Sequence, residues 1–320
     1  MSISVQKVMA YDLTNPIYND EEAARKHFEQ IRWPHGVTCP HCGVIGNSVE
    51  LKGKSTRSGV YKCRDCRKPF TVTVGTVYER SKIPLHKWLL ATHLICASKK
   101  GISAHQLFRM LGFGSYRTAW FMAHRIREAM ADVAPAPVGG NDGGVEMDET
   151  YFGDKNEIKK RTKRGKAAHS SKRSVVALVE RKGKTRMFHV ERADKETVLK
   201  IIQNHIEPKS KLYTDDSALY WDASRLVSGH SVVKHTAGEY VRGGAHTNSV
   251  EGLFGLFKRG MRGVYQHCGE QHLHRYLNEF EFRYNNREKL GCDDLARTEK
   301  LLKATEGKRL TYQQVGARAA

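Results

Sequence analysis

The chain has 320 residues, enough for more than one domain, and a hydrophobic content of 39%, which is compatible with a globular protein. Its 54 Lys and Arg outnumber its 34 Asp and Glu, giving a formal net charge of +20. This charge favours a polyanionic partner, and nucleic acid more than a membrane surface. The sequence has no apolar run of about 18 residues and does not begin like a signal peptide. We therefore expect a soluble, intracellular protein without a membrane partner.

Two CxxC pairs are the clearest local pattern in the first third of the chain. Cys39 and Cys42 form the first pair, and Cys63 and Cys66 form the second after residues 43–62. Each pair places two thiolates on one side of a tight turn, and four thiolates suit a tetrahedral zinc ion. An odd total of seven cysteines in an intracellular chain argues against a disulfide framework. We therefore expect one structural zinc held by these four residues.

The segment around these cysteines is predicted to be a zinc ribbon, because YKC and KPFTVTVGTV have the composition of short strands. Such a zinc usually holds a small domain together, and contact with DNA is a secondary role that remains open. His41 lies inside the first pair and is an alternative ligand to one thiolate. Cys96, Cys268 and Cys292 are isolated, and we expect them to be packing residues.

Helical patterns lie on both sides of the cysteine pairs. A short helix is predicted over residues 21–32. Residues 85–130 predict three further helices, with turns at residues 99–101 and 112–114. These elements are expected to form a helical domain next to the zinc ribbon.

The last two of these helices are typical of a helix-turn-helix DNA-binding domain. A short helix and a glycine-containing turn precede a longer helix that carries Arg117, Arg125 and Arg127. Ser103 and Ser115 are the expected N-caps. The alternative is a plain three-helix bundle with solvated arginines, and the net charge favours the DNA-binding interpretation.

The second half of the chain predicts a mixed sheet. Residues 134–144, APAPVGGNDGG, have the composition of a linker. After them come three strands, a helix, a strand, a short helical stretch, a strand, a loop and a helix, which is the ribonuclease H-like order with helices on both faces of the sheet. The predicted strands span residues 145–152, 174–180, 185–191, 211–214 and 231–235.

Three carboxylates that are distant in sequence are expected to meet at one edge of this sheet. Asp148 lies midway along the first strand, Asp215 follows the fourth strand, its expected neighbour, and Glu251 opens the helix after the fifth. Two magnesium or manganese ions about 3.5–4 Å apart need such oxygen ligands for phosphoryl transfer. Lys258 and Arg259 lie two helical turns beyond Glu251, which places a cation on the same helix face.

Several residues near these carboxylates have competing interpretations. Asn248 and Glu251 fit a capping box, so Glu251 also has a purely structural interpretation, and Asn248 is either the cap or an indirect support of a metal site. His246 either orients a phosphate or is an ordinary packed residue. Alternation along a strand lets only one of Asp215 and Asp216 face inward; Asp215 continues the strand pattern, but the choice remains open.

By the same alternation, Glu149 is expected to point away from its neighbour Asp148. On the last long helix, HLHRYLNEFEFRYNN, the apolar residues are expected to pack on the sheet, whereas Arg283 and Arg287 are expected to face DNA. The run from Lys159 to Arg173 contains eight Lys or Arg and no acid. It is interpreted either as a solvated insertion or as a clamp on the DNA backbone.

Four segments together resemble the DDE-type insertion-sequence transposases of the ISXO-like group, which carry an N-terminal zinc ribbon. The segments are VEMDETYFG, LYTDDSALY, HTNSVEGLFGLFKRG and HLHRYLNEFEFRYNNR. The resemblance implies a DDE triad of Asp148, Asp215 and Glu251, hydrolytic nicking at the ends of the element, and attack of the freed 3′-hydroxyl on target DNA. It also implies that Lys258 holds terminal phosphates, and Phe254 stands where the family usually has Trp.

The resemblance further implies the partners of the chain. We expect double-stranded DNA, as both element ends and target, and a homodimer or higher oligomer that pairs two ends. The expected location is cytoplasmic and nucleoid-associated in a prokaryotic cell. Two other functions remain open: a domesticated DNA-binding regulator that uses only the ribbon and the helices, and a nuclease of the same fold that lacks strand transfer.

The expected fold class is multidomain α+β, with a zinc ribbon, a helix-turn-helix-like helical domain and a ribonuclease H-like catalytic domain built on a mixed sheet. The expected divisions are an N-terminal helical segment (1–32), the zinc ribbon (33–82), the helical DNA-binding domain (83–133), the linker (134–144), the DDE catalytic domain (145–292) and a C-terminal helical tail (293–320).

Overall fold

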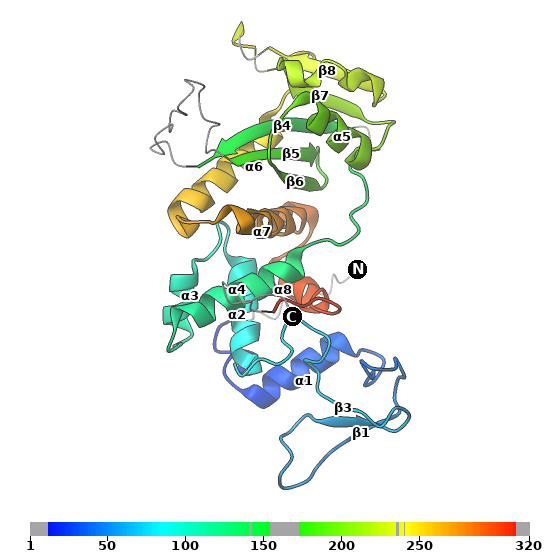
Figure 1. Ribbon diagram of the computed structural model, residues 1–320, viewed down its shortest axis with the longest axis vertical. Coiled ribbons are helices and arrows are strands. Elements are labelled where there is room, and N and C mark those ends of the chain that lie inside the picture. Colours follow the sequence, from blue (N-terminus) through cyan, green and yellow to red (C-terminus); the bar gives the residue numbers. More distant parts are fainter. Residues whose placement is uncertain (1–11, 141–142, 154–172, 235–236, 240, 312–320) are drawn as a thin grey trace, which may run out of the picture. The chain divides into compact units, whose positions relative to one another are not determined.

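A computed structural model of the chain describes residues 12–140, 143–153, 173–234, 237–239 and 241–311. The chain divides into two compact units, and each is described by itself (Figure 1). The first unit combines Met1–Met130 with Cys292–Ala320, and the second is Ala131–Gly291. Among the helices of these described residues, none is both long and apolar enough to cross a membrane.

The first unit begins with the predicted short helix. Helix α1 (Glu21–Arg32) starts where the Asp20 side chain accepts a hydrogen bond from the backbone amide of Ala23. Two further acids, Glu21 and Glu22, occupy the first turn, where the positive end of the helix dipole favours them. Ala24 and Phe28 are buried, so the helix packs through one face.

A small antiparallel sheet follows, with the strand order β1-β2-β3. The strands are β1 (Ser48–Glu50), β2 (Tyr61–Cys63) and β3 (Pro69–Phe70). The predicted strand at YKC is β2, and the short strand predicted within KPFTVTVGTV is β3, which is limited to Pro69 and Phe70. Beyond them the threonines bond locally, and the hydroxyl of Thr76 donates to the carbonyl oxygen of Thr73 at 2.7 Å. Such local bonds compete with strand pairing.

The three predicted helices of residues 85–130 are present. They are α2 (Leu85–Ala97), α3 (Ala104–Met110) and α4 (Tyr116–Met130). Ser103 caps α3 as expected, since its hydroxyl accepts from the amide of Gln106 at 3.1 Å. Arg117 is exposed, but Arg125, which was expected on the helix surface, is buried. Its guanidinium donates to the carbonyl oxygen of Glu79 at 2.7 Å and lies over the ring of Trp88.

The segment expected as a C-terminal tail contains α8 (Asp294–Lys303), which belongs to the first unit and contacts α1 and α2. Its Arg297 donates to the carbonyl oxygen of Cys96 at 2.9 Å. Just beyond α8, the carbonyl oxygen of Thr305 accepts from the amide of Val77 at 3.2 Å. Residues 316–320, the end of the sequence, are expected to be weakly ordered and lie outside the described residues.

The second unit is built on the predicted mixed sheet, with the strand order β6-β5-β4-β7-β8. Strands β4, β5 and β6 are antiparallel neighbours, whereas β7 runs parallel to β4 and β8 parallel to β7. The predicted short helical stretch before β8 is a pair of 3-10 turns. The strands are β4 (Val145–Phe152), β5 (Arg173–Glu180), β6 (Thr185–Val190), β7 (Lys211–Asp215) and β8 (Gly229–Val233).

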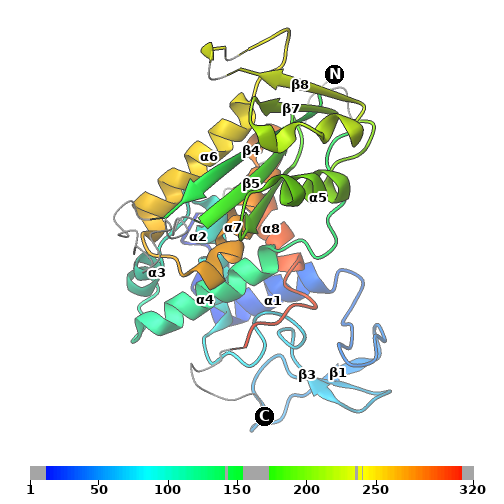
Figure 2. The same cartoon turned by 45° about the horizontal axis from the view of Figure 1, so that its top comes forward.

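Helices cover both faces of this sheet (Figures 1 and 2). On one face, Val175 and Ala177 of β5 pack with α6 (Asn248–Gly260) and α7 (Leu273–Asn285). On the other face, Val176 and Leu178 pack with α5 (Lys195–His205). Alternation along β5 therefore supplies two separate cores, as expected for a strand that is buried on both sides.

The segment predicted as a linker is partly packed against the second unit. Val138 is buried, and its backbone forms a parallel bridge to Ile206 just beyond α5. The amide of Gly140 donates to the hydroxyl of Ser210 at 2.8 Å. Of the predicted basic run, residues 159–172 lie outside the described residues. Arg173 begins β5 and donates to the carbonyl oxygen of Cys268.

Of the two arginines expected to face DNA, Arg283 lies in α7 and Arg287 lies just beyond its end, and both make contacts within the second unit. Arg283 is buried, and it pairs with the buried carboxylate of Glu279 one turn earlier on the same helix. Arg287 donates to the carbonyl oxygens of Gly183 and Tyr284. Sequence periodicity places both arginines on one helix face but does not reveal that an acid and a neighbouring turn already engage them.

Candidate zinc and carboxylate sites

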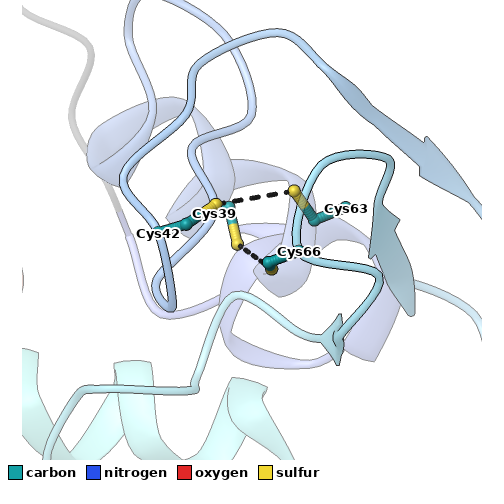
Figure 3. Close-up of side chains that lie close together, drawn as sticks. All are labelled: Cys39, Cys42, Cys63 and Cys66. Atoms are coloured by element: carbon teal, nitrogen blue, oxygen red, sulfur yellow. Dashed lines mark hydrogen bonds between the residues drawn. The ribbon is translucent and has the colours of Figure 1, made fainter.

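The four predicted cysteine ligands form one cluster in the first unit (Figure 3). Their sulfur atoms all lie within 4.8 Å of one another. The Sγ atoms of Cys39 and Cys66 are 3.6 Å apart, and so are those of Cys42 and Cys63. Sulfurs bound at about 2.3 Å around a tetrahedral zinc ion are about 3.8 Å apart, so this cluster fits the ion.

His41 is not part of this cluster. Its Nε2 atom lies 3.4 Å from the carbonyl oxygen of Pro69. The two cysteine pairs are brought together by an aromatic core in which the rings of Trp33, Tyr61 and Phe70 contact one another. Because β2 carries Tyr61 and ends at Cys63, packing of the Tyr61 ring in this core determines where the second cysteine pair lies.

In the second unit, Asp148 and Asp215 lie on neighbouring parallel strands. The register of β4 and β7 pairs Glu146 with Tyr213. Asp148 follows Glu146 by two residues, and Asp215 follows Tyr213 by two residues. The strand that carries Asp215 is therefore the neighbour of β4, as the sequence predicts.

Alternation along β4 separates the two adjacent acids. Glu149 lies on the face covered by α5, where its carboxylate accepts a hydrogen bond from the Tyr220 hydroxyl at 2.5 Å. Tyr220 belongs to the core on that face. The expectation that Glu149 points away from Asp148 is therefore confirmed.

Asp215 and Asp216 differ in their positions relative to the end of β7. Asp215 is the last residue of the strand, paired with Val233, and its carboxylate accepts from the amide of Ser217 at 3.1 Å. Tyr213, two residues before Asp215 and hence on the same face, lies under the guanidinium of Arg181. Asp216 follows the strand end and lacks this strand placement.

Glu251 lies in the first turn of α6, but the capping box predicted for Asn248 and Glu251 is wrong. The cap position is Thr247, and Asn248 is the first helical residue and is exposed. The hydroxyl of Thr247 donates to the Glu251 carboxylate at 2.9 Å. Glu251 thus bonds to the cap side chain rather than to a free backbone amide.

The free amides at the start of α6 are instead satisfied from the sheet by Glu146, which the sequence analysis did not identify. Its buried carboxylate accepts from the amides of Ser249 at 2.7 Å and Val250 at 3.2 Å, and from the Ser249 hydroxyl at 3.0 Å. Glu146 lies two residues before Asp148, on the same face of β4. That spacing is the sequence signal that could have pointed to it.

Arg181, in the turn between β5 and β6, completes this contact. Its Nε donates to the Glu146 carboxylate at 2.8 Å, and its Nη1 and Nη2 donate to the carbonyl oxygens of Gly244 and His246. The Nδ1 atom of His246 lies 3.2 Å from the Glu146 carboxylate. His246, a candidate for orienting a phosphate, thus has its ring nitrogen beside an acid.

The electrostatics of Asp148 show that the predicted carboxylates share one environment. Burial raises the pKa of Asp148 to about 7, and the Glu149 carboxylate adds to the rise. A hydrogen bond from the Glu149 amide lowers the pKa, whereas the charges of Asp215 and Glu251 raise it further. The charges of Asp215 and Glu251 therefore both act on Asp148, and the oxygen donors of the three carboxylates are those that hard divalent cations prefer.

These carboxylates are less tightly gathered than the cysteine thiolates. Across the described segments, the four cysteines are the one group whose possible metal-ligating atoms meet within 4.8 Å. Further along α6, Lys258 is half-buried and lies on the same side as Glu251. Arg259 is exposed, and its guanidinium lies beside Gly255 on its own helix.

Comparisons with known proteins agree with both sites. Residues 19–69, which contain the cysteine cluster, match the transposase zinc-ribbon domain. Residues 141–285, which contain the carboxylates, match the ISXO2-like transposase domain. These two matches define a class of protein, the insertion-sequence transposases with an N-terminal zinc ribbon. The chain belongs to the ISXO2-like family within that class.

The chain is also similar to a curated protein described as an uncharacterized protein in transposable element ISH50, from Halobacterium salinarum. The two sequences are 29% identical over 279 residues, which cover 82% of this chain and 90% of the relative. The similarity therefore extends over both units.

Replacing Cys63 with Ser should release zinc from the ribbon, because a thiolate ligand is lost. We expect the bound zinc, measured by atomic absorption, to fall from about one ion per chain towards none, with a lower unfolding temperature. Cys292→Ala is the matched control, since Cys292 is also buried but lies outside the cluster. Full zinc content in Cys63→Ser would contradict the assignment.

The raised pKa of Asp148 predicts how stability depends on pH in magnesium-free buffer. The folded state holds the Asp148 proton up to about pH 7, whereas the unfolded chain releases it near its ordinary value of 3.8. The stability that this proton contributes is complete below about pH 4 and is lost as pH rises to about 7, at up to about 1.4 kcal/mol per pH unit. In urea unfolding, the free energy of unfolding of Asp148→Asn should therefore rise relative to that of the wild type between pH 5 and 7. A pH-independent difference would contradict this prediction.

Proposed function

We propose that the protein is a DDE transposase of an insertion sequence. It binds the terminal inverted repeats of its element, nicks the DNA in a metal-dependent step and transfers the freed 3′-hydroxyl to target DNA. In this proposal Asp148, Asp215 and Glu251 are the catalytic carboxylates, on a ribonuclease H-like fold. The resemblance noted from sequence and the family membership both support this reaction.

The observation that carries the proposal is that three sequence-distant carboxylates lie on neighbouring elements of the mixed sheet and that two of them act electrostatically on the third. Asp148 and Asp215 come from neighbouring parallel strands, and Glu251 comes from a helix whose first turn is bonded to β4. The strand order β6-β5-β4-β7-β8, with β7 parallel to β4, supports the proposed ribonuclease H-like arrangement. Besides burial, the charges of Asp215 and Glu251 raise the pKa of Asp148, and a cation would stabilise such a group of carboxylates.

In the reaction, the three carboxylates would hold two magnesium or manganese ions, whose chemistry would be to activate the attacking oxygen and to stabilise the leaving one. Asp148 must lose its proton to act as a ligand, so cation binding and deprotonation are linked. Thr247 restrains the Glu251 carboxylate through its hydroxyl. The substrate oxygen that attacks is water in the nicking step and the DNA 3′-hydroxyl in the transfer step.

The same proposal assigns phosphate contacts to Lys258 and Arg259. Lys258 lies two turns beyond Glu251 on one side of α6, which would set a cation beside the phosphates of a DNA strand held at the carboxylates. Arg259 is exposed one residue later. Phosphate contacts carry no sequence information, so both side chains are expected to act without regard to sequence.

DNA binding by the first unit is the second part of the proposal. The net charge of +20 favours a polyanion, and α3 and α4 are the candidate helix-turn-helix. Arg117 is exposed near the start of α4, and we propose that it contacts a phosphate or a base. We further propose that a homodimer or higher oligomer pairs the two element ends, and that binding weakens as salt rises.

Replacing any of the three carboxylates should abolish metal-dependent cleavage of a DNA fragment that carries the element end. For Asp215→Asn we expect a loss of more than about 100-fold, because residues that only orient metal ligands already cost about 10–100-fold. DNA binding, measured by gel shift in the same buffer, should remain. Asp216→Asn is the matched control, and it should cleave like wild type.

Retained cleavage in Asp215→Asn together with its loss in Asp216→Asn would move the ligand to Asp216. Joining of a cleaved end to a second DNA molecule separates a transposase from a nuclease of the same fold. Specific DNA binding without any magnesium-dependent or manganese-dependent cleavage by the wild type would favour a regulator and overturn the proposal.

A further inference from the structure

The start of α6 is held by a residue that is not one of the proposed metal ligands. Glu146 is fully buried, and its carboxylate pairs with Arg181 and meets three donors from Ser249 and Val250 on the first turn of the helix. Helices are ordinarily capped by a side chain just before their first turn. Here that side chain, Thr247, is bonded to Glu251 instead, and the cap comes from the sheet.

Arg181 joins this cap to two other parts of the site. Its guanidinium bonds to Glu146 on β4, lies 4.0 Å from the ring centroid of Tyr213 on β7, and bonds to His246 in the loop before α6. Each of the three contacted residues comes before one of the proposed ligands in the sequence, either on the same strand or in the loop that leads into the helix. Those ligands are Asp148 after Glu146, Asp215 after Tyr213, and Glu251 after His246.

Stability alone does not account for this arrangement. A buried ion pair loses the hydration of both charges, so it stabilises a fold little compared with apolar residues of the same size. It does impose a single geometry, because both groups lose heavily if they separate. The three elements that carry the carboxylates are thereby tied at one point, close to where their ligands must meet.

We propose that Glu146, together with Arg181, is the positioning residue that sets the metal-ligand geometry of this site. The buried pair fixes the first turn of α6 on β4 and β7, and this places Glu251 in register with Asp148 and Asp215. The inference rests on the proposed function, since it concerns the same carboxylates. Glu146 itself neither binds the metal nor contacts DNA.

The test is the affinity of the full chain for Mn²⁺, measured by electron paramagnetic resonance of the free ion, which does not depend on cleavage. We expect Glu146→Gln to weaken Mn²⁺ binding by about 10–100-fold, as is typical when a residue that orients metal ligands is changed. Cleavage by this variant should recover at high Mn²⁺ concentration. Asp148→Asn, which lacks a ligand, should not recover.

Glu279→Gln is the matched control. Glu279 is equally buried, and its carboxylate pairs with Arg283 within α7 and accepts from the hydroxyl of Tyr265, which follows the end of α6 that is remote from Glu251. It should lose thermal stability and keep the wild-type affinity for Mn²⁺. Ser249→Ala removes only one hydroxyl bond to Glu146 and is expected to fold; about a fivefold loss of Mn²⁺ affinity is expected.

The outcomes separate the inference from the function on which it rests. If Asp148→Asn abolishes Mn²⁺ binding but folded Glu146→Gln and Ser249→Ala both bind like wild type, the positioning role is refuted and the metal site stands. An equal loss of affinity in Glu279→Gln would also refute it, because the effect would then be one of general stability. If the wild type does not bind Mn²⁺, or binds it independently of Asp148, the proposed function itself is refuted.

Discussion

The alternation of side chains along β4 is the constraint on which the second unit depends. One face of this strand carries Glu146 and Asp148, and the other carries Glu149, bonded to Tyr220. Shifting the register by one residue would exchange these faces, so that the helix cap, the candidate ligand and both cores would be lost together. The site is therefore specified by the same pairing that specifies the fold.

Crowding carboxylates has an energetic cost that the surrounding structure must offset. The pKa of Asp148 is raised by burial and by its acidic neighbours, so binding of a proton or a cation at the site is favoured. Apolar cores on both faces of the sheet supply the stability that such a site removes. A divalent cation would relieve the repulsion that a proton relieves at low pH.

Patterns in the sequence predicted those features that depend on residues close to one another in the chain. The cysteine pairs, the strand order and the parity of Glu149 follow from spacing, composition and alternation, which one sequence contains. The cap of α6 could not be predicted, because it depends on Arg181 meeting Glu146 across three elements. The strand predicted within KPFTVTVGTV ends at Phe70 for a related reason, since side-chain bonds within the turn won over the strand preference of Val and Thr. The catalytic role of the carboxylates remains a prediction.

The return of α8 to the first unit has a consequence for the order in which the chain matures. Helix α2 is apolar around most of its circumference, and α8 covers part of it. A ribosome makes α8 only after the whole second unit. The core of the first unit cannot close before α8 has been made, whereas the second unit is continuous and can fold earlier. A protein cut short after the second unit would carry its carboxylates but lack a finished first unit.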